Sequence, residues 1–151
     1  MLRKLTLIAA VLVAGPAFAQ DAVELTSTGD AAEGEKAFRQ CQSCHVVQNA
    51  EGEVLAGRAA KTGPNLYGVA GAPYGSIADF SYSDVMMAAA AAGAVHDTEE
   101  DFVAYVMDPT EHLRELSGED GRGKMTYKVR KEEDAINLWA FLIQYPATPE
   151  S

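Results

Sequence analysis

The chain has 151 residues and a formal net charge of −10 at pH 7, with 22 acidic and 12 basic side chains. This length provides for one domain built around one hydrophobic core. A chain this acidic repels phosphates, so the composition excludes general nucleic-acid binding.

The first nineteen residues have the features of a secretory signal peptide. Arg3 and Lys4 form a basic start, a short apolar run follows, and small residues precede an expected cut after Ala19. An uncleaved anchor is the alternative, but the apolar run is short for a membrane span. We therefore expect residues 1–19 to be removed and residues 20–29 to form a flexible mature N-terminus. The mature protein is expected in a bacterial periplasm, with no stable membrane insertion.

The first predicted helix covers residues 31–40 and leads into a pair of cysteines. Asp30 can cap this helix, and Glu33 stands three residues later, as in a capping box. Gly34 and Phe38 fall on one face, where the glycine permits close approach by another helix.

Cys41 and Cys44 are the only two cysteines, and His45 follows directly. A C-x-x-C core serves a redox dithiol, half of a zinc site or, with a following His, covalent haem attachment. A dithiol expects the motif at the start of a helix after a strand, and a zinc site needs further ligands that only His96 and His112 offer. A disulfide between the two cysteines would close a very small loop and stabilise little. Haem attachment explains every element of the motif, because the thiols add to the vinyl groups and the imidazole becomes an iron ligand.

Two more helices are predicted after a long irregular segment at residues 46–82. Ser83 or Asp84 opens an Ala-rich helix that Gly93 stops. Thr98 caps the next helix, which carries an apolar stripe at i, i+3, i+4 spacing and ends at the Asp-Pro pair.

The last predicted helix covers residues 131–145, has acids in its first turn and a broad apolar face, and ends before Pro146. β signals are sparse along the chain. Irregular segments as long as 46–82 and 117–124 are uncommon in a compact domain unless something organises them. A large, flat apolar cofactor would provide the missing interior surface.

A methionine on the far side of a haem iron raises the reduction potential and suits electron transfer. Met125 follows the Gly-rich stretch GEDGRGK and precedes the β-like TYKV, so its side chain can lie over a haem face. Met86, Met87 and Met107 fall in helical patterns, where ordinary packing is the better interpretation.

His96 and His112 are the alternative ligands, and they would give a bis-histidine centre of low potential. Both are flanked by acidic residues, a pattern that favours titrating surface groups.

Several motifs together resemble those of class I c-type cytochromes. They are GEKAFRQCQSCHVVQ, KTGPNLYGVAG, FSYSD, FVAYVMDP and GKMTYKV. The resemblance is closest to the soluble periplasmic carriers of alphaproteobacteria that look like mitochondrial cytochrome c. It implies an all-α fold, with four main helices and long loops around one covalently bound haem c. The haem domain is expected over residues 30–145, followed by a tail at 146–151.

The resemblance also assigns roles in binding the haem. It implies that Cys41 and Cys44 form the thioethers and that His45 and Met125 are the axial ligands. It implies that the Pro64 carbonyl accepts a hydrogen bond from the other ring nitrogen of the ligand histidine.

Two tyrosines receive roles in the same way. Tyr105 is expected beside the methionine sulfur, and Tyr82 is expected to hydrogen-bond a haem propionate. Simple core filling is the alternative for both.

The resemblance implies a crossing of the first and last helices. Gly34 and Phe38 are expected to pack against the face formed by Leu138, Trp139 and Leu142.

The chain departs from the family at two positions near the expected propionates. Ala72 stands where relatives often have an arginine, and His96-Asp97 stands in the region of a propionate-binding tryptophan. How the propionates are solvated is therefore open.

The expected function is electron transfer, not enzymatic catalysis. The resemblance implies a monomer that shuttles single electrons from a quinol:cytochrome c reductase to a terminal oxidase or photosynthetic reaction centre. Cations are expected to form the docking face of this otherwise acidic molecule. They are Arg39, Lys61, Lys124, Lys128, Arg130 and Lys131. Two rival functions are a haem enzyme or gas sensor with a labile Met125, and an exported dithiol protein without haem.

Overall fold

The computed structural model describes residues 24–145. The expected signal peptide (1–19) and the C-terminal tail (146–151) lie outside the described residues, as does the start of the expected N-terminal segment. Within the described range the elements are α1 (Ala31–Ala37), a 3₁₀ turn (Phe38–Gln40), β1 (Val46–Gln48), β2 (Val54–Gly57), α2 (Asp84–Ala91), α3 (Glu99–Met107), α4 (Pro109–Ser117) and α5 (Glu132–Leu142).

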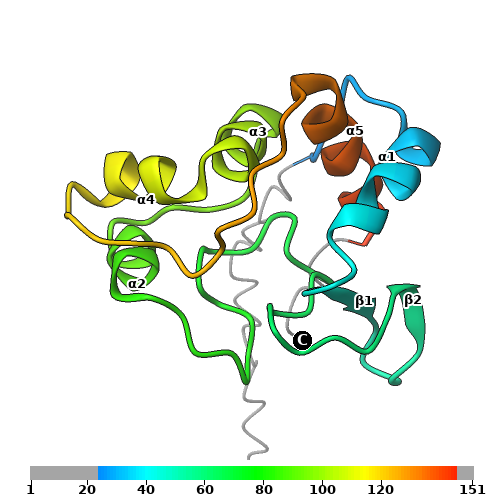
Figure 1. The fold of residues 1–151 in the computed structure, drawn as a ribbon, viewed down its shortest axis with the longest axis horizontal. Helices are drawn as coiled ribbons and strands as arrows, with labels where there is room; N and C mark the ends of the chain where they lie inside the picture. The colour runs from blue at the N-terminus through cyan, green and yellow to red at the C-terminus, as the bar shows by residue number, and fades with distance from the viewer. Residues whose placement is uncertain (1–23, 146–151) are drawn as a thin grey trace, which may run out of the picture.

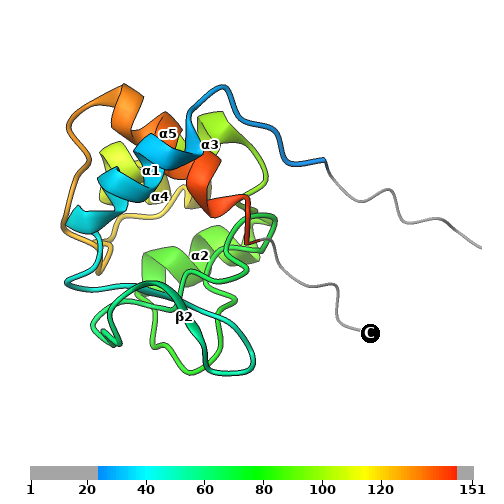
Figure 2. The same cartoon turned by 90° about the vertical axis from the view of Figure 1, so that its right-hand side faces the viewer.

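The helices form two groups, α1 with α3 and α5, and α2 with α4, which meet where α3 packs on α4. Helix α1 packs on α5, and α5 packs on α3, while α2 packs on α4 (Figure 1). The small β1–β2 hairpin lies below α1 and α5 in both views (Figures 1 and 2). None of the described helices combines the length and apolar character needed to cross a bilayer.

Helix α1 begins at the predicted cap. The Asp30 carboxylate accepts hydrogen bonds from the backbone N–H groups of Ala32 and Glu33, which would otherwise lack partners. The expected capping box does not form, because the Glu33 side chain bonds Lys36 at 2.7 Å. The Asp30 N–H instead donates to Asn137 Oδ1 on α5 at 2.8 Å, so the cap also ties α1 to α5.

The predicted crossing of the first and last helices is present. A Cβ atom added at Gly34 would lie 1.9 Å from the carbonyl oxygen of Asn137, so the two backbones approach too closely for any side chain there. Phe38 is fully buried, and its ring centroid lies 5.3 Å from that of Phe141. Leu138, Trp139 and Leu142 are buried in the same core cluster.

One helix, α4, was not expected from the sequence. Helix α3 ends at Asp108 as predicted, but the same residue caps α4 by accepting a hydrogen bond from Glu111 N–H. Pro109 occupies the first turn, and Gly118 ends the helix with φ of 69°. The start and stop signals were present, but this helix is largely polar and lacks a broad apolar stripe.

Two expectations about strands were wrong. The segment 46–82 contains the antiparallel β1–β2 hairpin, in which Val46 pairs with Gly57. The β-like TYKV at 126–129 is not a strand, and Val129 N–H donates to the carbonyl of Val106 at 2.9 Å. That bond ties the segment 118–131 to α3.

Candidate functional site

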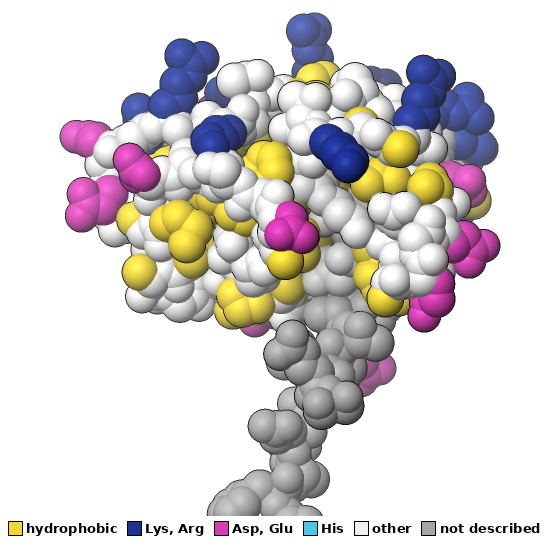
Figure 3. All heavy atoms as spheres, turned by 90° about the horizontal axis from the view of Figure 1, so that it is seen from below, with side chains coloured by type: hydrophobic (Ala, Val, Ile, Leu, Met, Phe, Trp, Pro, Cys, Tyr) yellow, Lys and Arg dark blue, Asp and Glu magenta, His cyan; other side chains and the backbone are white. Residues whose placement is uncertain are grey.

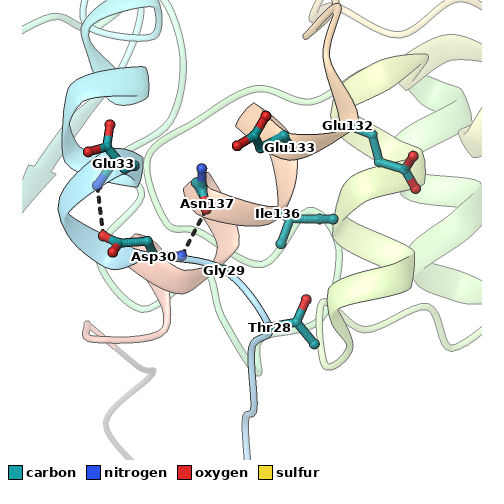
Figure 4. Close-up of a pocket in the computed structure, with 8 residues that line it drawn as sticks. All are labelled: Thr28, Gly29, Asp30, Glu33, Glu132, Glu133, Ile136 and Asn137. Carbon is teal, nitrogen blue, oxygen red and sulfur yellow. Dashed lines mark hydrogen bonds between the residues drawn. The ribbon is translucent and has the colours of Figure 1, made fainter.

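The structure has two hollows of interest among the described residues. The first is a groove of ≈ 710 Å³ between the starts of α1 and α5 (Figure 4). Its lining is Thr28, Gly29, Asp30, Glu33, Glu132, Glu133, Ile136 and Asn137. The groove is wide open, and its side chains are mostly polar or acidic, without an apolar wall to hold a flat ligand.

The second hollow is a cavity of ≈ 270 Å³ with mainly apolar walls, between the two helix groups. It brings together residues from distant parts of the sequence. All the site residues predicted above line it: Cys41, Cys44, His45, Pro64, Tyr82, Tyr105 and Met125. Phe38, Leu66, Met86, Phe102 and Leu138 contribute to its apolar walls.

A single turn of backbone places both cysteines and the histidine on this cavity. After the 3₁₀ turn, the carbonyl of Cys41 accepts hydrogen bonds from Cys44 N–H at 3.1 Å and from His45 N–H at 2.9 Å. The two cysteines are not joined by a disulfide. Burial raises the pKa of the Cys41 thiol to about 11, and the neighbouring Cys44 adds to this shift.

The His45 ring is fixed in one orientation and tautomer. Its Nδ1 lies 2.9 Å from the carbonyl oxygen of Pro64, which can only accept, so Nδ1 carries the proton. Burial lowers the pKa of His45 and outweighs the opposing effect of this hydrogen bond. The imidazole is therefore neutral, with a free lone pair on Nε2, as a metal ligand requires.

Gly63 makes room for that ring. A Cβ atom at this position would lie 2.4 Å from His45 Cε1, which is far inside van der Waals contact. Gly63 N–H also donates to the Cys44 carbonyl at 2.8 Å, so the loop that contains Gly63 is hydrogen-bonded to the segment that contains the cysteines.

The segment that contains Met125 forms side-chain contacts with residues on both sides of the cavity. Lys124 Nζ donates to Ser81 Oγ at 3.2 Å and stands 5.9 Å above the Phe80 ring. On the other side, Tyr127 hydrogen-bonds the Gln40 side chain, just before the first cysteine. These contacts span the cavity between loop 73–83 and the 3₁₀ turn.

The two predicted tyrosines lie in the cavity wall. Burial raises the pKa of both Tyr82 and Tyr105, so both hydroxyls stay protonated near neutral pH. Tyr82 packs edge-on against Phe80, with ring centroids 4.9 Å apart. Because they stay protonated, the hydroxyls of Tyr82 and Tyr105 can each donate a hydrogen bond to an acceptor inside the cavity.

The expectation that His96 and His112 are surface groups was wrong. His96 is 6% exposed and lines the cavity. The side chain of His112 is 12% exposed, and its Nε2 lies 2.8 Å from Asp101 Oδ1. Acidic neighbours in sequence suggested exposure, but α3 and α4 pack together and enclose these side chains.

The interpretation of the other methionines needs one correction. Met86 is buried and lines the cavity, in keeping with ordinary packing. Met87, next to it on α2, is 49% exposed and is not a core residue.

The residues present fit a covalently bound haem. A porphyrin needs an apolar slot, two thiols on one edge and an imidazole with a free Nε2, and the cavity offers all three. Gly63 and the neutral His45 are features that ordinary core packing does not require.

Comparisons with known proteins agree with this fit. The cytochrome c2 of Rhodovulum adriaticum is 57% identical over 116 residues, which is 76% of this chain and 91% of the relative. The cytochrome c2 of Cereibacter sphaeroides is 49% identical over 142 residues, covering 93% and 92%. The crystal structure of Rhodobacter sphaeroides cytochrome c2 superposes with a TM-score of 0.76 at 52% identity, covering 80% of this chain and 99% of that one. No family model matches the chain.

Proposed function

The chain belongs to the cytochrome c2 family of class I c-type cytochromes, and from this premise we propose that it is a soluble periplasmic shuttle for single electrons. It is an electron-transfer protein and not an enzyme. The proposed cofactor arrangement is one haem c, with thioethers from Cys41 and Cys44 and axial ligands from His45 and Met125.

One observation carries the proposal: both thiols, the neutral imidazole and the Met125 side chain line the same apolar cavity. When bound, the haem supplies a one-electron couple at its iron. The rival functions do not account for this convergence. A dithiol protein has no need of the cavity, and family membership favours electron transfer over an enzyme or sensor.

The chain's own residues prepare the site for electron transfer. The Pro64 carbonyl keeps the proton on His45 Nδ1 and so fixes the ligand nitrogen. The Met125 thioether is a weak donor and favours the reduced state, which raises the potential. The contacts of Lys124 and Tyr127 hold the Met125 segment in place, so the geometry can stay the same in both oxidation states.

Partner docking is proposed at the cationic face. In Figure 3, Lys and Arg side chains gather along the upper edge of the molecule, and acidic side chains lie at both flanks. That edge is the front of Figure 1, where the segment 118–131 runs. The proposed partners are a quinol:cytochrome c reductase as donor and a terminal oxidase or photosynthetic reaction centre as acceptor.

Not every predicted cation is equally available to a partner. Lys128 forms an ion pair with Asp108, and Lys124 binds Ser81, so both have partners within the protein. Arg130 lies in the same segment and is exposed, so we use it as the probe of the face.

The test is oxidation of the reduced holoprotein by oxidase-containing membranes at rising ionic strength. Electrostatic steering predicts a second-order rate that falls with salt, and Arg130→Glu should lower the low-salt rate by about threefold to tenfold. Lys36→Glu is the matched control, since Lys36 is an exposed cation that pairs with Glu33 on α1, outside the segment 118–131. A rate independent of salt, or equal losses in both variants, would contradict docking at this face.

A further inference from the structure

Four side chains form a buried polar cluster beside the cavity. Asp101 on α3 lies at its centre, with His112 from α4, Tyr74 from the loop before α2 and His96 from the segment before α3. None of these residues has a role in the haem site proposed above. Helices α3 and α4 are consecutive and packed together, as Figure 1 shows.

Asp101 is held as a charged carboxylate. Its Oδ2 accepts a hydrogen bond from the Tyr74 hydroxyl at 2.8 Å, and its Oδ1 lies 2.8 Å from His112 Nε2. Burial opposes the charge, but the contacts with His112, His96 and Tyr74 outweigh burial and hold the pKa of Asp101 well below its usual range. A buried anion of this kind favours a compensating positive charge nearby.

His96 is placed to carry that charge. Its Nδ1 lies 3.5 Å from Asp101 Oδ2, yet this buried nitrogen makes no hydrogen bond with any described residue. The ring stacks on Tyr74 with centroids 3.6 Å apart. The backbone is also fixed, since His96 N–H donates to Ala72 at 3.0 Å and its carbonyl accepts from Gly71 N–H at 2.7 Å.

A neutral His96 leaves this arrangement incomplete. A neutral imidazole has one nitrogen without a proton, whichever tautomer is present. A second proton would give the ring a positive charge beside the carboxylate and allow a charge-assisted hydrogen bond to Asp101. Tyr74 and His112 already donate to that carboxylate, whereas His96 Nδ1 makes no hydrogen bond, so His96 is the member whose protonation would add a new bond to Asp101.

We propose that His96 is a redox-linked proton site, which binds a proton from solvent when the neighbouring haem receives an electron. This inference rests on the proposed function, because it requires the cofactor in the cavity that His96 lines. One electron enters from the redox partner and one proton binds an imidazole nitrogen, so no net charge is added and no covalent bond of the chain breaks.

The direction in which reduction changes the proton affinity of His96 follows from charge. Reduction lowers the charge at the cofactor by one unit, so a nearby proton is bound more tightly in the reduced protein. A unit charge at a separation on the order of 10 Å, in a medium of effective dielectric about 20, changes a proton affinity about tenfold. The reduction potential then falls as pH rises between the two titration points, and is flat below and above them.

The titratable groups around His96 come from every segment packed against it. They are Tyr74, Asp97, Asp101, Tyr105, His112 and Glu115. The tyrosines stay protonated near neutral pH, since burial raises the pKa of Tyr74 and of Tyr105. The depressed pKa of Asp101 keeps its carboxylate charged there as well, and histidine is the side-chain type that ordinarily exchanges protons in this range.

The first experiment measures the reduction potential of the holoprotein from pH 5 to pH 9. We expect a total fall of about 59 mV, which corresponds to a tenfold difference in proton affinity between the redox states. Reduction in weakly buffered solution with a pH indicator should also take up about half a proton per electron midway through this range.

Variants identify the group that binds the proton. His96→Phe keeps a ring against Tyr74 but removes both nitrogens, so it should abolish the pH dependence. Tyr74→Phe and His112→Phe each remove a donor to Asp101. They should keep the dependence and move it to higher pH, because the carboxylate then attracts the His96 proton more strongly.

A pH dependence that survives His96→Phe would assign the proton to the haem carboxylates or another group and overturn the proposal. If His96→Phe does not fold, NMR titration of the wild-type His96 ring decides. Titration at higher pH in the reduced protein supports the proposal, and equal titration in both redox states refutes it. Far-red absorption by the ferric protein reports methionine ligation separately, so failure of this inference is distinguishable from failure of the proposed function.

Discussion

Asp101 accepts hydrogen bonds from two side chains distant in sequence and lies close to a third. We therefore expect it to govern the acid stability of the fold. Its folded-state pKa is depressed, so its stabilising contribution is fully present above the unfolded-state value of about 4 and is lost as pH falls below it. The wild-type free energy of unfolding should accordingly decline between about pH 5 and pH 2.

Asp101→Asn should cost about 1–3 kcal/mol at neutral pH and flatten this acid decline, because the amide carries no charge to lose. Urea unfolding followed by circular dichroism at pH 7, 5 and 3 measures both effects. Glu100→Gln, on the exposed side of the same first turn of α3, is the control and should leave the decline unchanged. An Asp101→Asn variant as acid-sensitive as the wild type would refute this account.

At the scale of single residues, prediction succeeded where chemistry is local. The spacing of Cys41, Cys44 and His45 is itself a chemical signature, and the bond from His45 to Pro64 is present as the resemblance implied. Prediction failed for His96 and His112, because their burial depends on how α3, α4 and loop 67–83 pack. No pattern in the flanking residues records that packing.

At the scale of elements, the crossing of α1 and α5 brings the two backbones into close contact at Gly34. Gly34→Ala should destabilise the holoprotein by about 1–3 kcal/mol or more, since the new methyl group would collide with the Asn137 carbonyl 1.9 Å away. Glu35→Ala, on the exposed side of the same helix, should change stability by about 0.5 kcal/mol or less.

Thermal or urea unfolding of both variants measures this difference. Equal stabilities would mean that the two helices do not approach as closely as the structure shows. Comparing Gly34→Ala with Glu35→Ala also separates the effect of packing from that of helix propensity, because alanine is a better helix former than either residue that it replaces.

Helices rich in apolar residues were easier to predict than the one that is largely polar. Helices α1, α2, α3 and α5 each have start signals and an apolar face, and all four were expected near their observed bounds. Helix α4 is largely polar, and Pro109, Leu113 and Leu116 mark only a narrow apolar stripe, so its caps were the strongest signal. The β1–β2 hairpin is short, and the first half of β2 is exposed, so alternation could not identify it.

At the scale of the whole molecule, the fold followed from the family resemblance and not from periodicity. Several motifs in order implied a helical domain wrapped around a cofactor, and the structure has that architecture with one more helix and a small hairpin. The cationic run near the end of the chain was visible in the sequence. Which of its members pair internally was not, because Asp108 and Ser81 are brought to Lys128 and Lys124 only by folding.

The central claim is that Cys41 and Cys44 attach a haem whose iron is bound by His45 and Met125. An optical spectrum of the purified protein in both redox states tests it most directly, with Met125→Ala and Met87→Ala measured beside the wild type. Met87 is a fair control because it is a methionine exposed on α2, outside the cavity lining.

The account predicts c-type bands that survive acid–acetone extraction, with a weak far-red band in the ferric wild type and in Met87→Ala. This band should be absent from Met125→Ala, and the reduced variant should bind carbon monoxide at neutral pH. A colourless protein, or a far-red band retained in Met125→Ala, would contradict the account.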